Sequence, residues 1–152
     1  MDVVSTAKRK EMMSGIRNKN TRPELLVRHS LHRMGFRYRL HAKVLPGKPD
    51  LVFPKHRAVI LVNGCFWHGH DCHLFKWPKT RREFWKSKIN GNIDRDRRNL
   101  ILLEEAGWRV CTIWECALKG KEKQDLNILF PRLGRWLESS VQRLQLSGSS
   151  SD

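Results

Sequence analysis

The sequence predicts a single α/β domain. Three short runs rich in β-branched and apolar residues have the pattern of strands, and longer segments around them repeat apolar residues every three or four positions. Such a mixture of strands and helices along one chain is typical of a sheet covered by helices. At 152 residues, the chain has the length of one domain with one sizeable core.

A polar, basic stretch precedes the first predicted helix. Residues 1–20 carry several lysines and arginines with little apolar periodicity, which predicts a basic N-terminal arm. The helix begins at Thr21, where Thr-Arg-Pro-Glu provides an N-cap, an early proline and a Glu three residues after the cap, and it ends near Gly35. Residues 36–41 then alternate apolar and basic side chains, as an exposed strand does.

Two paired strands follow. Residues 50–53 and 58–62 are apolar and β-branched, and the Pro-Lys-His-Arg segment between them has the composition of a turn. Pairing about this turn predicts two cross-strand neighbours, Leu51 with Leu61 and Asp50 with Val62. Asp50 is thereby expected beside the beginning of a segment rich in cysteine and histidine, residues 63–72.

The rest of the chain alternates helix, strand and helix. Residues 79–106 repeat apolar side chains near the 3.6-residue period and predict one long or broken helix, which a glycine ends. Residues 108–114 predict a third apolar strand, and leucines within 126–137 predict a last helix. Because the chain ends in a Ser/Gly-rich run, we expect a folded domain over 21–140 and a disordered tail over 141–152.

The charge of the chain favours a polyanionic partner. Thirty Lys and Arg against 15 Asp and Glu give a formal net charge of +15 at pH 7. A field of one sign attracts nucleic acid more readily than an acidic small molecule. No apolar run approaches the roughly 20 residues of a membrane span, and the first ten residues lack the apolar core of a signal peptide. We therefore expect a cytoplasmic protein without a membrane partner.

Residues 63–72 combine two cysteines and two histidines with two aromatic rings. Cysteines in an unexported chain are typically metal ligands or buried thiols, because a reducing compartment does not sustain structural disulfides. Cys111 lies within a predicted strand and reads as a buried thiol, whereas Cys116 follows that strand and can turn inward. We expect a structural zinc site in which protein fills all four positions; inert buried thiols are the alternative. The proposed ligands are Cys65, His70, Cys72 and Cys116.

Two further residues have the chemistry of a hydrolytic site. Asp50 follows a proline at the beginning of a strand, a usual place for a carboxylate that binds a hard cation such as Mg²⁺. The alternative is an Asp that caps a turn. His68 lies between the candidate zinc ligands, and an imidazole near a cation and a phosphate is suited to activate water as a general base. Alternatively, His68 faces solvent or exchanges roles with His70.

Aromatic and basic side chains indicate how DNA would be contacted. Phe66, Trp67 and Trp85 are candidate wedges, because apolar rings inserted between base steps unstack DNA; core packing is the alternative. The segment 76–98 carries nine Lys or Arg against three acids. Phosphate contacts are expected from Arg81, Arg82, Lys86, Lys88, Arg95, Arg97 and Arg98.

Seven short motifs occur in a fixed order along the chain. They are Thr21-Arg-Pro-Glu24, Leu45-Pro-Gly-Lys-Pro-Asp50, Gly64-Cys-Phe-Trp-His68, Arg82-Glu-Phe-Trp85, Asp94-Arg-Asp-Arg-Arg98, Gly107-Trp-Arg-Val110 and Trp114-Glu-Cys116. Over about residues 8–137 this combination resembles the very short patch repair endonucleases. The resemblance implies nicking of double-stranded DNA on the 5′ side of the thymine in a T:G mismatch, which arises when 5-methylcytosine deaminates. It also implies a restriction-endonuclease-like three-layer core, a mixed β-sheet flanked by helices, with a structural zinc.

Position by position, the resemblance implies a role for each candidate. Asp50 would bind the catalytic Mg²⁺ together with the backbone carbonyl of Val62, and His68 would activate the attacking water. Glu24 first reads as the capping-box residue of the first helix, but it matches a family residue near the active site. The same comparison assigns zinc to Cys65, His70, Cys72 and Cys116, and intercalation to Phe66, Trp67 and Trp85.

One position departs from the family pattern, which has Thr-His where this chain has Val62-Asn63. Asn63 can donate a hydrogen bond to a phosphate or water but cannot carry a proton at neutral pH. We expect a working nuclease that is slower or has a shifted sequence preference.

It would act as a monomer in the bacterial cytoplasm, associated with the nucleoid through DNA, with other mismatch-repair proteins as candidate partners. Two alternatives remain: a restriction-type nuclease without mismatch specificity, and a non-catalytic, zinc-stabilised DNA-binding module.

Overall fold

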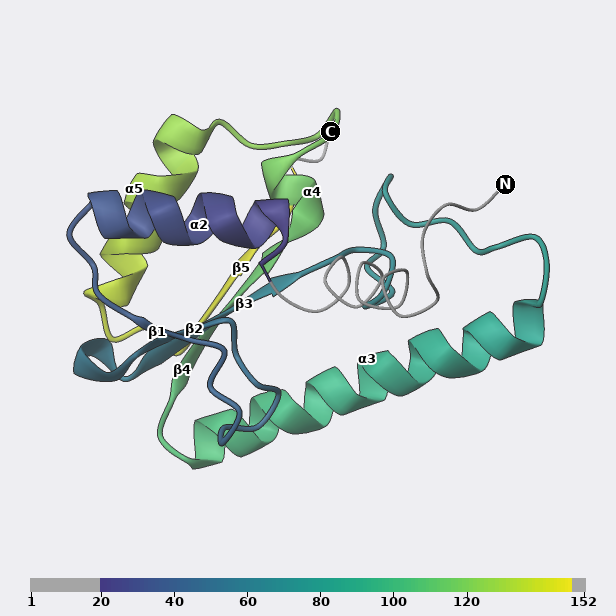
Figure 1. The fold of residues 1–152 in the computed structure, drawn as a ribbon, viewed down its shortest axis with the longest axis horizontal. Coiled ribbons are helices and arrows are strands. Elements are labelled where there is room, and N and C mark those ends of the chain that lie inside the picture. Colours follow the sequence, from purple (N-terminus) through teal and green to yellow (C-terminus); the bar gives the residue numbers. More distant parts are fainter. Residues whose placement is uncertain (1–19, 149–152) are drawn as a thin grey trace, which may run out of the picture.

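A computed structural model describes residues 20–148, which form a five-stranded mixed sheet with helices on both faces (Figure 1). The elements run in this order: α2 (Arg22–Arg33), β1 (Arg39–Leu40), β2 (Leu51–Phe53), the 3-10 turn η1 (Pro54–His56), β3 (Ala58–Asn63), α3 (Arg82–Glu105), β4 (Arg109–Trp114), α4 (Glu115–Leu118), α5 (Leu126–Leu137) and β5 (Arg143–Leu146). The predicted arm over 1–20 lies outside the described residues, except for Asn20. None of the helices in the described part could span a membrane.

The sheet has the order β1-β2-β3-β4-β5. β1, β2 and β3 pair antiparallel, whereas β3, β4 and β5 pair parallel. Parallel neighbours need a crossover connection, which α3 supplies between β3 and β4, and α4 with α5 supplies between β4 and β5. The carboxyl ends of β3 and β4 therefore meet at one edge of the sheet, where Asn63 is paired with Trp114.

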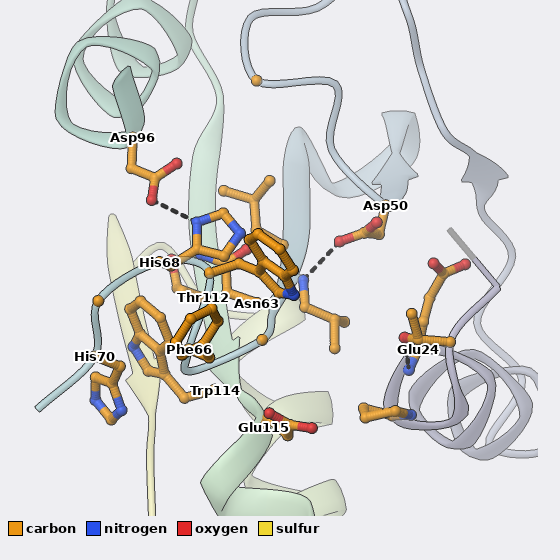
Figure 2. Close-up of a pocket in the computed structure, with 18 of the residues that line it drawn as sticks. Glu24, Asp50, Asn63, Phe66, His68, His70, Asp96, Thr112, Trp114 and Glu115 are labelled. Atoms are coloured by element: carbon orange, nitrogen blue, oxygen red, sulfur yellow. Dashed lines mark hydrogen bonds and ion pairs between the residues drawn. The ribbon is translucent and has the colours of Figure 1, made fainter. Parts of the chain in front are cut away.

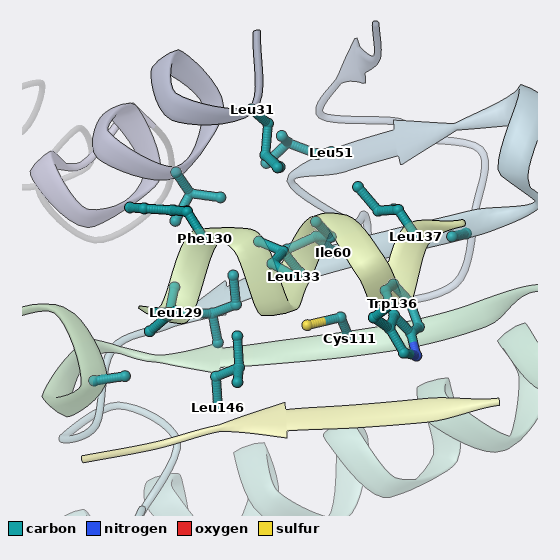
Figure 3. Close-up of a cluster of buried hydrophobic side chains, with 14 of the residues drawn as sticks. Leu31, Leu51, Ile60, Cys111, Leu129, Phe130, Leu133, Trp136, Leu137 and Leu146 are labelled. Atoms are coloured by element: carbon teal, nitrogen blue, oxygen red, sulfur yellow. The ribbon is translucent and has the colours of Figure 1, made fainter. Parts of the chain in front are cut away.

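The core lies mainly between the sheet and the helices α2 and α5. Leu31 of α2, Ile60 of β3 and Leu133 of α5 are fully buried in the larger cluster (Figure 3). A smaller cluster on the opposite face packs Val59 of β3 and Leu103 of α3. Neighbouring residues of β3 thus enter different clusters, because side chains alternate across a sheet. Burial on both faces explains the continuous apolar run that the sequence shows.

Local sequence signals placed the helices well. The Thr21 hydroxyl accepts a hydrogen bond from the backbone N–H of Glu24 at 3.3 Å, which confirms the predicted N-cap of α2. The long helix is a single unbroken α3 of 24 residues. Gly107 follows it with a φ of +91°, a left-handed conformation that favours glycine after a helix.

The predicted register of the hairpin was wrong by one residue. Leu51 is paired with Ile60 and Phe53 with Ala58, rather than Leu51 with Leu61. The physical reason is the connection: η1 ends in Arg57, whose left-handed φ of 52° returns the chain so tightly that β3 begins directly opposite the end of β2. Even so, the backbone N–H of Val62 donates a 2.7 Å hydrogen bond to Asp50, so these two residues do meet.

The predicted disordered tail over 141–152 also needs correction. Residues 143–146 form β5, which pairs in parallel with β4 along its length, and Leu146 is fully buried. Further along, the backbone N–H of Gly148 donates to the Cys116 sulfur at 3.1 Å. The low-complexity composition begins only at residue 147, so the predicted start of the tail at 141 was several residues too early. The predicted strand over 36–41 is likewise reduced to the two residues of β1.

A single guanidinium ties the end of α5 to the sheet. Arg109, the first residue of β4, donates from Nη1 to the carbonyl oxygens of Trp136 and Val141 at 3.0 and 3.2 Å. Its Nη2 donates to the carbonyls of His56 and Leu137 at 3.0 and 2.7 Å. Two of these acceptors lie in the last turn of α5, where carbonyls have no intrahelical partner.

Arg109→Met is expected to lower the free energy of unfolding by about 3 kcal/mol, because it leaves partly buried carbonyls without a charged donor. Chemical denaturation with urea, followed by far-ultraviolet circular dichroism, measures the change. Arg135→Met removes an exposed arginine from the same helix and should cost less than about 0.5 kcal/mol. Equal losses in the two variants would contradict the role given to Arg109.

Candidate active site and metal cluster

A cleft of about 1530 Å³ opens at the carboxyl ends of β3 and β4 (Figure 2). This edge is where ligands usually bind in open α/β sheets. The beginning of α2, the segment before β2, the segment after β3, the middle of α3 and the beginning of α4 contribute to its walls. The four residues with candidate roles in catalysis, Glu24, Asp50, Asn63 and His68, all line it.

Asp50 lines the cleft and lies directly before β2. One of its oxygens accepts the 2.7 Å hydrogen bond from the N–H of Val62 on β3. Burial raises the pKa of Asp50 to about 7; the Val62 N–H and the nearby His68 oppose the rise, and Glu24 adds to it. A partly buried carboxyl of this kind is poised to exchange its proton for a cation.

Glu24 is almost fully buried, with 1% of its surface exposed. Its Oε1 accepts from the backbone N–H of Asn20 at 2.9 Å, and its Oε2 accepts from Arg28 at 3.1 Å. Its Oε2 also lies 2.8 Å from Nε2 of His41. Glu24 is therefore more than a capping residue of α2, because its carboxylate points into the fold beside the cleft.

His41 was not found from the sequence. It follows β1 with a left-handed φ of 49°, which an ordinary side chain rarely adopts, and this backbone turns its ring toward Glu24. Glu24, His41 and Asp50 each offer one ligand-type atom, and these atoms lie within 4.8 Å of one another. No local pattern in the sequence marks His41, because its role depends on a contact 17 residues away.

His68 is oriented by a carboxylate from α3. Its Nδ1 lies 2.6 Å from Oδ2 of Asp96, and both side chains are partly exposed (Figure 2). When Nδ1 carries the proton and donates it to Asp96, Nε2 is left as the acceptor. Asp96 belongs to the Asp94-Arg-Asp-Arg-Arg98 motif, which by itself indicates no role for this carboxylate. Little in the sequence singles it out, because an acidic residue among basic residues of a helix usually only neutralises their charge.

The predicted zinc ligands come together. Cys65, His70, Cys72 and Cys116 each place a ligand atom within 4.8 Å of the others. All four cysteines of the chain are free thiols, and Cys111 is a fully buried core residue outside this cluster, as predicted. Nδ1 of His70 lies 3.6 Å from the Cys116 sulfur.

The donor chemistry of this cluster fits a tetrahedral metal ion. Burial raises the pKa of Cys65 and of Cys116, and burial lowers the pKa of His70. A bound cation would offset the cost of ionising the thiols, and the depressed histidine pKa keeps the imidazole in its neutral, ligand form. His70 also stacks on Trp114, with ring centroids 4.1 Å apart. That stack connects the cluster to the cleft, which Trp114 lines.

The three candidate wedges form one contact group. The Phe66 ring lies 5.2 Å from Trp67 and 5.4 Å from Trp85, and Trp67 lies 5.8 Å from Trp85. All three are partly exposed, and Phe66 and Trp67 line the cleft. The basic residues expected to contact phosphate are all exposed, namely Arg81, Arg82, Lys86, Lys88, Arg95, Arg97 and Arg98.

Asp50→Asn is expected to stabilise the protein more at about pH 8 than at about pH 5. The carboxyl has a pKa of about 7 in the folded chain, against about 3.9 in an unfolded chain. Its raised pKa stabilises the fold below the unfolded value, and this contribution is lost between about pH 4 and pH 7 as the carboxyl ionises. An amide does not ionise, so the gain in unfolding free energy should grow by at least about 1 kcal/mol across that window.

Urea unfolding of both proteins in magnesium-free buffer at the two pH values measures this gain. Asp94→Asn, at an exposed position of α3, controls for the loss of one negative charge. A gain at position 50 that is the same at both pH values would contradict a pKa raised by burial.

Comparison with known proteins identifies the family of the chain. The family model for DNA mismatch endonuclease Vsr matches residues 1–74. The type II nicking enzyme V.XorIIP of Xanthomonas oryzae is 47% identical over 91% of this chain and 98% of its own length. The DNA mismatch endonuclease Vsr of Escherichia coli is 45% identical over 90% of this chain and 87% of its own length. The type II nicking enzyme V.NmeAIP of Neisseria meningitidis is 45% identical over 79% of this chain. Identity of this extent, together with the motifs, shows that the chain belongs to the DNA mismatch endonuclease Vsr family.

Proposed function

We propose that this chain is a Mg²⁺-dependent endonuclease that nicks double-stranded DNA on the 5′ side of the thymine in a T:G mismatch. The observation that carries the proposal is the convergence of Asp50 and His68 on one cleft from opposite sides. The relatives' names, a mismatch endonuclease and nicking enzymes, support the reaction class. We also assign the mixed sheet and its helices to a restriction-endonuclease-like core.

The residues around Asp50 fit a hard divalent cation. The proposed ligands are the Asp50 carboxylate and the backbone carbonyl of Val62, with the Glu24 carboxylate close by. Bound Mg²⁺ supplies stabilisation of the charge that develops on the phosphate. Since the pKa of Asp50 is about 7, this carboxyl must lose its proton to act as a ligand. Metal affinity is therefore expected to rise with pH through neutrality.

His68 is the proposed general base. With Nδ1 donating to Asp96, the lone pair of Nε2 can accept a proton from the water that attacks phosphorus. Asp96 holds this tautomer and stabilises the imidazolium that forms. Because both groups are partly exposed, water screens their attraction, and positioning is the main contribution of Asp96.

The segment from Cys65 to Cys72 would combine two tasks. Zinc held by Cys65, His70, Cys72 and Cys116 would fix the segment on β4 and α4. Four protein donors leave no open position, so this ion would be structural. Phe66 and Trp67, from the same segment, would enter the base stack beside the mismatch with Trp85, which costs less where pairing is already weak.

Asn63 is proposed to modulate the reaction. It is 9% exposed, it is paired with Trp114 in the β3–β4 ladder and it lines the cleft. Its amide can hold a phosphate or a water but cannot transfer a proton at neutral pH. His68 is left as the proton acceptor, so we expect a slower enzyme or one with a shifted sequence preference.

The central test is nicking of a duplex that contains one T:G pair, in Mg²⁺. We expect the parent to cut the thymine strand on its 5′ side and to leave the matching T:A duplex intact. Asp50→Ala should lower the rate at least about 100-fold, a usual loss for one electrostatic group at the reacting centre. Asp94→Ala, at an exposed position two residues before Asp96, is the matched control and should keep the parent rate.

Each alternative has its own outcome in this assay. Equal cutting of T:G and T:A duplexes would indicate a restriction-type nuclease without mismatch specificity. Tight binding without cleavage in any divalent metal would indicate a DNA-binding module. Equal rates for the parent and Asp50→Ala would contradict the proposed metal site.

The zinc assignment predicts one equivalent of chelator-resistant zinc per chain. Elemental analysis after dialysis against a chelator should find it in the parent and in Cys111→Ala, because Cys111 lies in the core and outside the cluster. Cys65→Ser and Cys116→Ser should both lose the ion, since each removes a thiolate ligand. Retention of stoichiometric zinc in both serine variants would show that the ligand set is wrong.

A further inference from the structure

Six aromatic side chains form one continuous network that begins in the cleft and extends beyond it. The members are Phe66, Trp67, Phe75, Trp77, Phe84 and Trp85, hereafter the aromatic network. From Phe66, which lines the cleft, the contacts continue outward to Phe75 at 5.9 Å in a stacked arrangement. Phe75 then contacts Trp77 at 4.9 Å. The network thus leads from the proposed wedges to a ring that does not line the cleft.

None of the six side chains is buried. Trp77 is 41% exposed and Phe84 is 45% exposed, and the other four are partly exposed. Aromatic side chains that stabilise a fold are normally buried, as Phe53 is in the core. A contiguous exposed aromatic surface of this kind marks a surface that a partner covers.

The surroundings of the network are basic. Lys76 and Lys79 flank Trp77 in the segment before α3, and both are exposed. The guanidinium of Arg81 lies 4.3 Å above the Phe84 ring. This segment and the first turns of α3 project away from the sheet (Figure 1). A projecting surface of rings among lysines and arginines is complementary to the bases and phosphates of nucleic acid.

We propose that Phe75 and Trp77 form an outer stacking surface that binds a nucleotide of the DNA flank, beyond the base pairs that Phe66, Trp67 and Trp85 would open. The proposal rests on the proposed function in one respect, that the partner is DNA. Trp77 packs against a base or deoxyribose face, and the neighbouring lysines contact phosphates on the same flank. The footprint on DNA is therefore longer than the cleft alone requires.

The test compares duplexes of different lengths. Fluorescence anisotropy in magnesium-free buffer measures binding of the full chain to a long duplex and to duplexes shortened on one side or the other of the central pair. Trp77→Ala should weaken binding to the long duplex about tenfold, a usual loss for one stacked base. On the duplex that lacks the contacted flank, the variant and the parent should bind equally. Trp77→Phe should restore most of the loss.

Ile128→Ala, at a 63% exposed position on α5, is the matched control and should bind as the parent does. A loss for Trp77→Ala that is the same on every duplex length would overturn the proposal, because it would show that Trp77 only supports the wedges. No loss on the long duplex would also overturn it.

The outcome is separable from that of the nicking assay. Because the contact lies outside the mismatch, T:G and T:A duplexes should show the same length-dependent loss. If Trp77→Ala shows this length-dependent loss of binding but the parent does not nick DNA, the proposed function is contradicted and the proposed stacking surface is still supported.

Discussion

The parallel pairing of β3 with β4 is the constraint on which the site depends. Its six residue pairs bring Asn63 and Trp114 side by side, so the segments that leave both strands begin at the same edge of the sheet. Cys65 and His68 follow one strand, and Cys116 follows the other. Asp50 is attached to the same edge through the N–H of Val62. A shift of this pairing by one residue would separate the candidate metal ligands and turn their side chains to opposite faces.

The free-energy cost of burying two carboxyl groups at this edge is offset by the rest of the fold. Two carboxyl groups, Glu24 and Asp50, are held close together, and burial, with a smaller contribution from Glu24, raises the pKa of Asp50. Such an arrangement works against folding, as functional sites often do. The apolar core between the sheet and the helices α2 and α5 offsets it, with Arg109 satisfying the carbonyls where α5 ends.

The sequence predicted features that are set by near neighbours and missed those set by distant ones. The N-cap at Thr21 and the long α3 follow from residue type and short spacing. Three members of the Cys/His cluster are also close in sequence, and the distant Cys116 was predicted from its place after a strand. The register of the hairpin depended on the backbone of Arg57, which composition does not reveal. β5 alternates polar and apolar residues as a strand does, but it is only four residues long and lies directly beside a low-complexity run, which hid it. His41 and Asp96 acquire their roles through partners 17 and 28 residues away, which no local pattern encodes.

Gly148, which follows the last strand of the sheet, contacts a residue that is synthesised much earlier. Its amide donates to Cys116, 32 residues earlier, and a side chain here would approach the carbonyl oxygens of Cys116 and Glu122 at 3.0 Å. Chains fold as they are synthesised, N-terminal part first. Until β5 leaves the ribosome, β4 is an edge strand with unpaired backbone groups, and the Cys116 sulfur lacks this donor. A chain that ended before β5 would therefore leave the edge of β4 unpaired and the Cys116 sulfur without this backbone donor.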